Sequence, residues 1–298
     1  MKHKLSITLL LLGMFLLTQF IGLYVVNSYF GHDLPYGLQT QENEEPSFLS
    51  IVFAFVFAFA IILILMKYRW KFVIKGWFFL VVTIALALSL NVILRSAFDM
   101  NAVVALVIAI PLAFLKIFRP HVLVHNITEL LIYPGIAAVF VPILTPITVI
   151  ALLILISFYD MWAVWKSGIM QKMAKFQMEE LRLFGGFLLP SVSDKVKKQI
   201  GKIKQKYKGK EIPESVKKKK FKVNLAILGG GDVIFPIITS GVFLSAFGIV
   251  SALFVVFGSL VGLTYLFLIT EKGKAYPAMP YISVGIFLGL LVWKVFFG

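Results

Sequence analysis

The chain has 298 residues, of which 60% are hydrophobic and only 14% charged, and it carries a formal net charge of +15 without a single cysteine. This composition excludes a soluble globular domain and indicates a polytopic membrane protein. The lack of cysteine excludes disulfides, thiolate metal sites and cysteine nucleophiles.

Nine apolar runs have lengths near the roughly 20 residues that span a bilayer as a helix. The first begins after Lys2 and Lys4 but is too long for a signal peptide, and no small-residue cleavage site follows it, so we interpret it as a spanning helix. We therefore predict an all-α polytopic membrane protein with nine transmembrane helices. The runs fall at about 5–26, 48–66, 72–94, 102–118, 122–141, 146–165, 223–246, 249–269 and 278–297.

Three parts follow from this pattern. Residues 1–166 carry helices one to six, residues 167–222 form a cytoplasmic basic loop, and residues 223–298 carry helices seven to nine. With nine spans, 27 of the 29 basic residues fall on one side of the membrane. Because cytoplasmic connections are enriched in Lys and Arg, we predict a cell-membrane protein with a cytoplasmic N-terminus and an external C-terminus.

The loop between the sixth and seventh segments is the only sizeable part outside the membrane. Met170 to Phe184 has a broad apolar face with basic residues largely opposite, which predicts a helix lying in the membrane interface. Lys195 to Lys222 is rich in lysine and poor in aromatic residues. We interpret this tract as a solvated loop attracted to anionic lipid, and we expect no nucleic-acid partner.

Histidines and one glutamate near the fifth segment raise the question of a metal site. His121 and His125 are one helical turn apart, and Glu129 follows another turn later. They lie beside Arg119 at a segment end, where interfacial histidines are ordinary, so no metal is predicted. Glu129 is interpreted as a packing or interfacial residue.

Two aspartates inside apolar runs are the strongest functional candidates, because an ionisable residue within a membrane span is costly. Asp160 lies six residues before Lys166, and Asp232 lies ten residues after Lys222. At 1.5 Å per helical residue these positions are roughly 9 Å and 15 Å from the inner face. Segments six and seven run in opposite directions, so the two carboxylates can face each other.

A pair of close carboxylates in a site of low dielectric cannot readily carry two charges, so the pair shares a proton. In peptide hydrolysis the ionised member can take a proton from the attacking water while the protonated member donates to the carbonyl oxygen. Three consecutive glycines precede Asp232 and weaken the helix there, which predicts a local cavity with Asp232 on its wall.

Three motifs resemble those of the presenilin and signal peptide peptidase family of GxGD intramembrane aspartyl proteases. They match the YD, GxGD and PAL motifs of that family, and they occur in order on segments six, seven and nine. The chain looks most like a microbial, archaeal presenilin homologue that acts without obligatory partner subunits. The motifs are Tyr159-Asp160, Gly229-Gly230-Gly231-Asp232 and Pro277-Ala278-Met279-Pro280.

The resemblance implies an intramembrane endopeptidase with Asp160 and Asp232 as its catalytic pair, needing no cofactor and acting on transmembrane helices of other proteins. It further implies that Tyr159 lines the substrate pocket. Met279 replaces the usual leucine and nearly conserves its volume. Gly230 occupies a position that is often leucine in presenilins, and as an implied substrate-binding residue it is expected to enlarge a subsite and loosen the loop. The remaining implied substrate-binding residues are Gly229 and Gly231 beside the pair, and Pro277, Ala278 and Met279 at the cleft.

A substrate helix must unwind before its peptide bonds can be hydrolysed. Because the glycine and proline motifs both interrupt helices at the inner depth of the aspartates, we hypothesise that the unwound substrate pairs there as an added strand. Two alternatives stay open: a proton-coupled transporter or channel that uses the aspartates as a relay, and a prepilin-type leader peptidase, which shares the GxGD signature.

Overall fold

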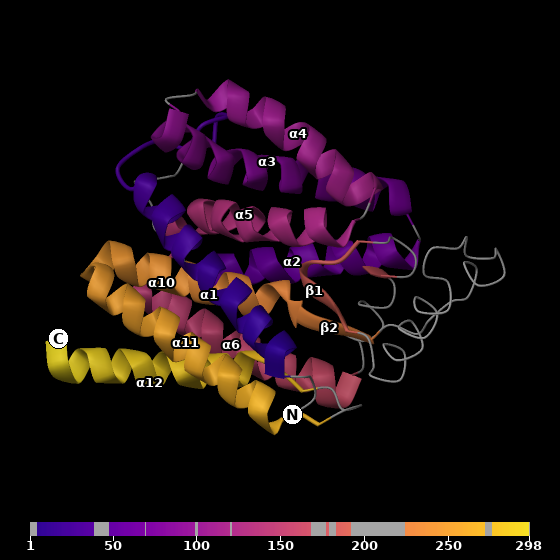
Figure 1. Cartoon of the computed structure of the whole chain (residues 1–298). Helices are drawn as coiled ribbons and strands as arrows, with labels where there is room; N and C mark the ends of the chain where they lie inside the picture. The colour runs from indigo at the N-terminus through magenta and orange to yellow at the C-terminus, as the bar shows by residue number, and fades with distance from the viewer. Residues whose placement is uncertain are drawn as a thin grey trace, which may run out of the picture.

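The structure is a computed structural model that describes residues 5–38, 48–68, 70–98, 101–119, 121–167, 177–178, 183–191, 224–271 and 276–297. Within these ranges the chain forms a bundle of apolar helices and one small antiparallel sheet (Figure 1). The N-terminal helices are α1 (Leu5–Ser28), α2 (Phe48–Lys67), α3 (Lys71–Phe98), α4 (Ala102–Phe118), α5 (Val122–Phe140) and α6 (Pro146–Trp162). The strands β1 (Gly186–Ser191) and β2 (Asn224–Gly229) precede helices α10 (Gly230–Phe247), α11 (Ile249–Ile269) and α12 (Met279–Phe297).

Each predicted apolar run contains one of these helices. In the part of the chain that the structure describes, seven helices are long and apolar enough to cross a membrane, which makes the chain a multi-pass membrane protein. Two apolar helices, Leu49–Leu65 and Ala102–Phe118, are shorter. The count of nine transmembrane helices therefore stays a prediction.

The prediction for the seventh segment was wrong in its first part. Residues 224–229 form strand β2, and the helix begins only at Gly230. The strand has the alternation of a sheet with one buried face, since Ala226 and Leu228 are buried while Ile227 is 38% exposed. The all-α expectation holds for the bundle but misses this two-stranded sheet.

Most of the predicted interfacial helix and the whole lysine-rich tract 195–222 lie outside the described residues. Residues 183–185 are not helical, so no helix continues through Phe184. Leu183 is buried at 7% exposure, which is the position of a core residue rather than of a side chain on the membrane surface.

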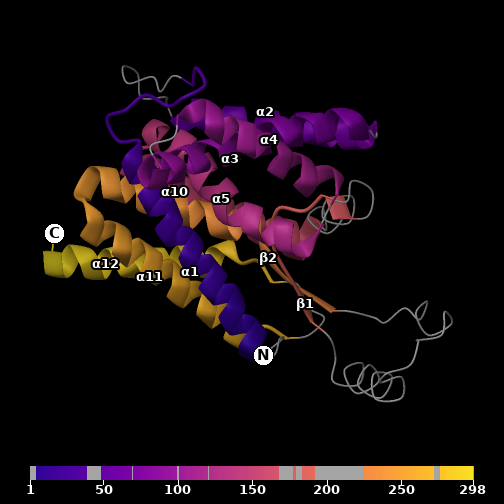
Figure 2. The same ribbon diagram turned by 45° about the horizontal axis from the view of Figure 1, so that its top comes forward.

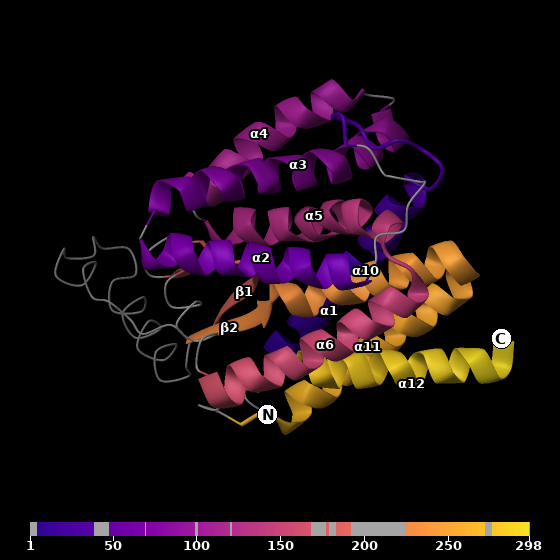
Figure 3. The same ribbon diagram turned by 180° about the vertical axis from the view of Figure 1, so that it is seen from behind.

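The helices pack in two groups that contact each other through α5 and α10, and α1 crosses both groups on one face of the bundle (Figure 1). Helices α3, α4 and α5 lie together, as do α10, α11 and α12, and α1 contacts both α5 and α10 (Figure 2). Helix α6 lies beside α12 and also contacts α10 (Figure 3). The strands lie at one end of the bundle, and strand β1 contacts α5.

Close contact between α11 and α12 depends on glycine. A Cβ atom added to Gly258 or Gly262 would collide with the backbone of α12, and one added to Gly285 or Gly289 would collide with α11. Each helix thus presents two glycines four residues apart, a spacing that allows membrane helices to approach closely. This contact fixes the position of the first turn of α12.

Large apolar side chains cover the outside of the bundle, as expected for a surface in contact with lipid. Trp70, Trp77, Trp162 and Trp165 are between 49% and 64% exposed. Exposed tryptophans near helix ends are typical of the membrane–water interface.

Candidate active site

Asp160 lies near the C-terminal end of α6, whose start is fixed by a cap. Thr145 and Thr148 form a reciprocal capping box, and Pro146 occupies the first turn. At the other end of α6 the Asp160 side chain is buried, with 8% exposure. Its Oδ2 atom accepts a hydrogen bond of 3.1 Å from the backbone N–H of Met279, and the N–H of Ala278 also interacts with it.

Asp232 lies in the first turn of α10, directly after strand β2. Gly229 ends the strand and caps the helix with an extended backbone at φ −64° and ψ 147°. The backbone N–H of Gly229 interacts with the Asp232 carboxylate. Because free N–H groups and the helix dipole favour an anion at this position, the first turn suits a carboxylate.

The two aspartates lie close enough to interact electrostatically. They come from α6 and α10, which pack against each other. Each carboxylate interacts with a backbone N–H group at the start of a helix. The donor is Gly229 for Asp232 and Met279 for Asp160. The structure thus brings together the sixth, seventh and ninth predicted segments at one site.

Met279 reaches this site through its backbone rather than its side chain. Its side chain is 3% exposed and belongs to the apolar core, and Pro277 is buried as well. The predicted role of Pro277, Ala278 and Met279 in shaping a cleft remains a prediction, but the donation of N–H groups to Asp160 was not anticipated.

Tyr159 is 40% exposed, with its ring centroid 6.3 Å from that of Trp162. It is adjacent to Asp160 in sequence, and its predicted place in a substrate pocket remains untested.

Tyr133 of α5 is a residue near the aspartates that the sequence analysis missed. It is 4% exposed, and its hydroxyl group interacts electrostatically with Glu129 and Asp232. A Cβ atom on Gly230 would lie only 2.8 Å from the Tyr133 hydroxyl oxygen. This crowding gives a physical reason for glycine at position 230, independent of any substrate subsite. In the sequence, Pro134 directly after Tyr133 is the one unusual feature of this segment, and it lies inside the continuous helix α5.

The residues considered for a metal site have a different environment. His121 is exposed, whereas His125 and Glu129 are buried with Lys116, whose ammonium pairs with the Glu129 carboxylate. Among the described residues no group of three His, Cys, Asp or Glu side chains is arranged to hold a metal. Glu129 is therefore the anion of a buried ion pair, a more specific role than the packing or interfacial one predicted.

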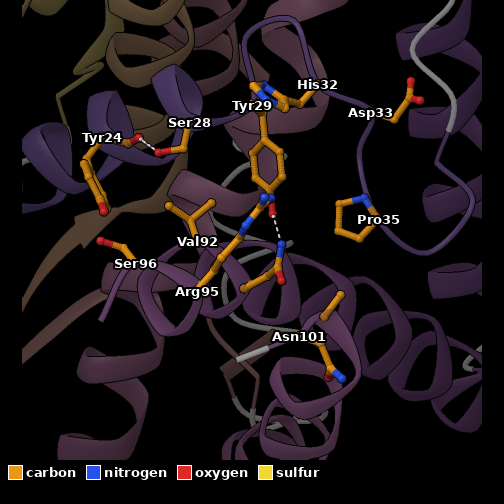
Figure 4. A pocket seen from close by; sticks show the side chains of 12 residues that line it. Tyr24, Ser28, Tyr29, His32, Asp33, Pro35, Val92, Arg95, Ser96 and Asn101 are labelled. Carbon is orange, nitrogen blue, oxygen red and sulfur yellow. Dashed lines mark hydrogen bonds between the residues drawn. The ribbon is translucent and has the colours of Figure 1, made fainter. Parts of the chain in front are cut away.

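A polar cavity of about 800 Å³ lies far from the aspartates, at the other end of α1 and α3. Figure 4 shows Arg95 beside the ring of Tyr29. The Asn91 amide donates to the Tyr29 hydroxyl at 3.1 Å. Tyr24, Ser28, His32, Asp33 and Asn101 complete most of its polar lining. Asp232 is not among the residues that line this cavity, so it is a different cavity from the one predicted at Asp232, which stays a prediction.

Comparison with known proteins identifies the family and the fold that this chain is similar to. Residues 12–298 match the family described as signal-peptide peptidase, presenilin aspartyl protease. Two solved structures of a presenilin family intramembrane aspartate protease have the same fold. One has a TM-score of 0.61 and 19% identity and aligns over 97% of this chain and 98% of the other. The second has a TM-score of 0.58 and 22% identity over 96% of each chain. No curated protein matches.

Proposed function

The chain belongs to the signal-peptide peptidase and presenilin family of aspartyl proteases, and we propose that it hydrolyses peptide bonds within transmembrane helices of other membrane proteins. Asp160 and Asp232 serve as the general acid and base, and no metal or other cofactor takes part. Family membership supports proteolysis in general, and the residues and the substrate class are our proposal.

The observation that carries the proposal is the meeting of Asp160 and Asp232 from two packed helices, each supplied with backbone N–H donors. These donors matter because a carboxylate in a membrane protein is stable only where other groups satisfy it. They also fix both side chains, so that a water molecule and a peptide carbonyl can be held between them.

The pair shares one proton in the reaction that we propose. The ionised carboxylate removes a proton from water as the water oxygen bonds to the carbonyl carbon, and the other carboxylic acid protonates the carbonyl oxygen. The carboxylic acid that formed when the base took the water proton then protonates the leaving nitrogen, the C–N bond breaks, and the other carboxylate takes a proton from a hydroxyl group of the tetrahedral intermediate. The products are a carboxylic acid and an amine, and the pair again shares one proton.

Among the described residues only β1 pairs with β2, and this supports the hypothesis that the substrate adds as a strand on the other edge of β2. Leu188 of β1 pairs with Ile227 of β2, but both backbone groups of Leu188 bond to Asn126. Leu188 and Ile227 are therefore a pair without hydrogen bonds between them, and the Ile227 backbone groups point away from β1.

Gly229 follows the same alternation, and its N–H reaches Asp232. An extended substrate segment along this edge would pass the catalytic pair.

We further propose that the N-terminus is cytoplasmic and the C-terminus external, from the distribution of basic residues. The aspartates then lie toward the cytoplasmic side. The substrates are single transmembrane segments presented through the lipid, and no partner subunit is required.

Purified protein incubated with a single-span membrane substrate tests the proposal. Mass spectrometry should show cleavage within the span, and Asp160→Asn and Asp232→Asn should each lower the rate by at least about 100-fold, the usual minimum effect of a general acid or base. The exposed Asp33, at the other end of the bundle, provides the control Asp33→Asn with unchanged cleavage.

Proton uptake into liposomes without cleavage would instead support the transporter. Cleavage restricted to short leaders would support a prepilin-type peptidase. Infrared spectra that show a fully helical bound substrate would contradict strand addition.

A further inference from the structure

Strand β1 is held along its outer edge by side chains of α5. The Asn126 amide donates to the Leu188 carbonyl at 2.8 Å and accepts from the Leu188 N–H at 3.0 Å. Two residues earlier, the Gly186 carbonyl oxygen lies 2.7 Å from Nε2 of His125. Helix α5 thus occupies the strand edge opposite β2, in the place of a third strand.

A buried lysine determines how His125 binds the strand. The Lys116 ammonium lies 3.2 Å from His125 Nδ1 and pairs with the Glu129 carboxylate. An ammonium group can only donate, so Nδ1 must accept. The imidazole is then neutral with its proton on Nε2, and this proton is donated to Gly186.

The contact on β1 reaches the catalytic pair through backbone atoms. The Gly185 carbonyl accepts a hydrogen bond of 3.1 Å from the N–H of Gly230, the first residue of α10. Asp232 follows two residues later. Gly186 has φ +136°, a conformation that favours glycine, and a Cβ atom there would collide with the Leu228 carbonyl. The position of β1 therefore determines where α10 begins.

A buried ion pair carries a large free-energy cost of desolvation. Lys116, His125, Asn126 and Glu129 are each between 2% and 8% exposed. Apolar side chains of similar size commonly stabilise a core as well or better. A positional role explains why charged and polar groups occupy the site.

We propose that Lys116, His125, Asn126 and Glu129 are positioning residues that set the register of the β1–β2 sheet and thereby the place at which a substrate strand meets Asp232. They do not touch the reacting atoms. The inference rests on the proposed protease function for its effect on cleavage, but the effect on the sheet can be measured without any activity.

Cross-linking measures the sheet directly, because the natural chain contains no cysteine. The pair Leu188→Cys and Ile227→Cys joins directly opposite residues without hydrogen bonds between them, a geometry that suits a disulfide. We expect rapid oxidation in the otherwise natural chain. Asn126→Leu removes both hydrogen bonds that hold Leu188 and should slow disulfide formation roughly tenfold or more. His121→Ala changes the exposed N-cap residue of α5, whose side chain makes no capping hydrogen bond, and should leave the rate unchanged.

Cleavage products measure the consequence for the reaction. Asn126→Leu and His125→Ala should spread the cleavage sites over neighbouring bonds and lower kcat more than they raise KM. His125→Gln keeps an N–H donor for Gly186 and should restore the natural product pattern. A general loss of stability would lower the rate without moving the cleavage sites.

The proposal would be overturned if Asn126→Leu and His125→Ala changed neither the rate of disulfide formation nor the cleavage sites. If disulfide formation slows in Asn126→Leu but the protein never cleaves a membrane substrate, the proposed function is wrong, whereas the positioning of β1 by α5 is confirmed.

Discussion

Gly262→Ala tests whether the contact between α11 and α12 holds the backbone donor at Asp160. The added methyl group would lie 3.0 Å from the Ile282 Cα atom and closer still to the Tyr281 carbonyl oxygen. Carbon atoms pack at about 3.5–4.0 Å, so the helices must separate by roughly 0.5–1 Å. Tyr281 and Ile282 follow Met279 within the first turn of α12. The separation of the helices therefore acts close to the Met279 N–H that binds Asp160.

Two opposing terms determine the change in the free energy of unfolding. Overpacking costs about 1–3 kcal/mol, whereas replacing glycine by alanine within a helix gains about 1 kcal/mol. We therefore expect a net loss of about 0–2 kcal/mol. The catalytic effect should be larger, because a shift of this size can take the 3.1 Å bond between Met279 N–H and Asp160 beyond hydrogen-bonding distance. A hydrogen bond to a charged group contributes about 1.5–3 kcal/mol, so kcat/KM should fall roughly 10-fold or more.

Thermal unfolding in detergent and cleavage of a single-span substrate measure the two effects on the same sample. Gly13→Ala is the matched control, because Gly13 lies in the exposed surface of α1 with no atom within 4 Å of an added Cβ. It should raise stability by about 0.5–1 kcal/mol and leave cleavage unchanged. If Gly262→Ala behaved like Gly13→Ala in both measurements, the reasoning would be refuted.

Three further predictions concern other parts of the molecule. Burial raises the pKa of Tyr36 from its ordinary value of 10.0 to about 12, so its contribution to stability is complete below pH 10 and is lost as the pH rises through about 12. Thermal unfolding of Tyr36→Phe should lack this decline, and an identical decline in the variant would refute the assignment. Gln19 donates to the Val233 carbonyl at 3.0 Å, but its own side-chain oxygen has no partner among the described residues. Gln19→Leu should therefore change the free energy of unfolding by less than about 1 kcal/mol, because the lost bond is offset by removal of a buried unpaired acceptor. Met279→Leu nearly conserves volume and keeps the N–H that binds Asp160, so cleavage should stay within about threefold of the natural rate, which corresponds to well under 1.5 kcal/mol.

Local sequence patterns predicted most of the helical bundle. Long apolar runs lie where the helices are, because a membrane allows few other ways of satisfying the backbone. The apolar pattern gave a wrong prediction at residues 224–229, which belong to an apolar run but form strand β2. Its alternation of buried and exposed residues is short, and the three glycines after it were interpreted as a weakened helix rather than as a strand end.

Some residues of the candidate site could be predicted from the sequence and others could not. Asp160, Asp232 and the Gly229–Gly231 motif stand out in the sequence because charged or flexible residues are rare in apolar runs. The buried ion pair of Lys116 and Glu129, by contrast, was not predicted, and Glu129 was interpreted as a packing or interfacial residue. Burial of charge depends on a partner from another helix, and no local pattern around either residue indicates that partner.

The order of residues is enough to predict that this protein crosses a membrane and that two aspartates are its candidate catalytic groups, since both conclusions follow from the cost of placing polar groups in an apolar medium. The three-dimensional arrangement was needed to show that backbone N–H groups of Met279 and Gly229 bind the aspartates, and that α5 occupies the outer edge of β1. Every backbone carries the same donors and acceptors, so which of them meet is decided when distant segments pack together.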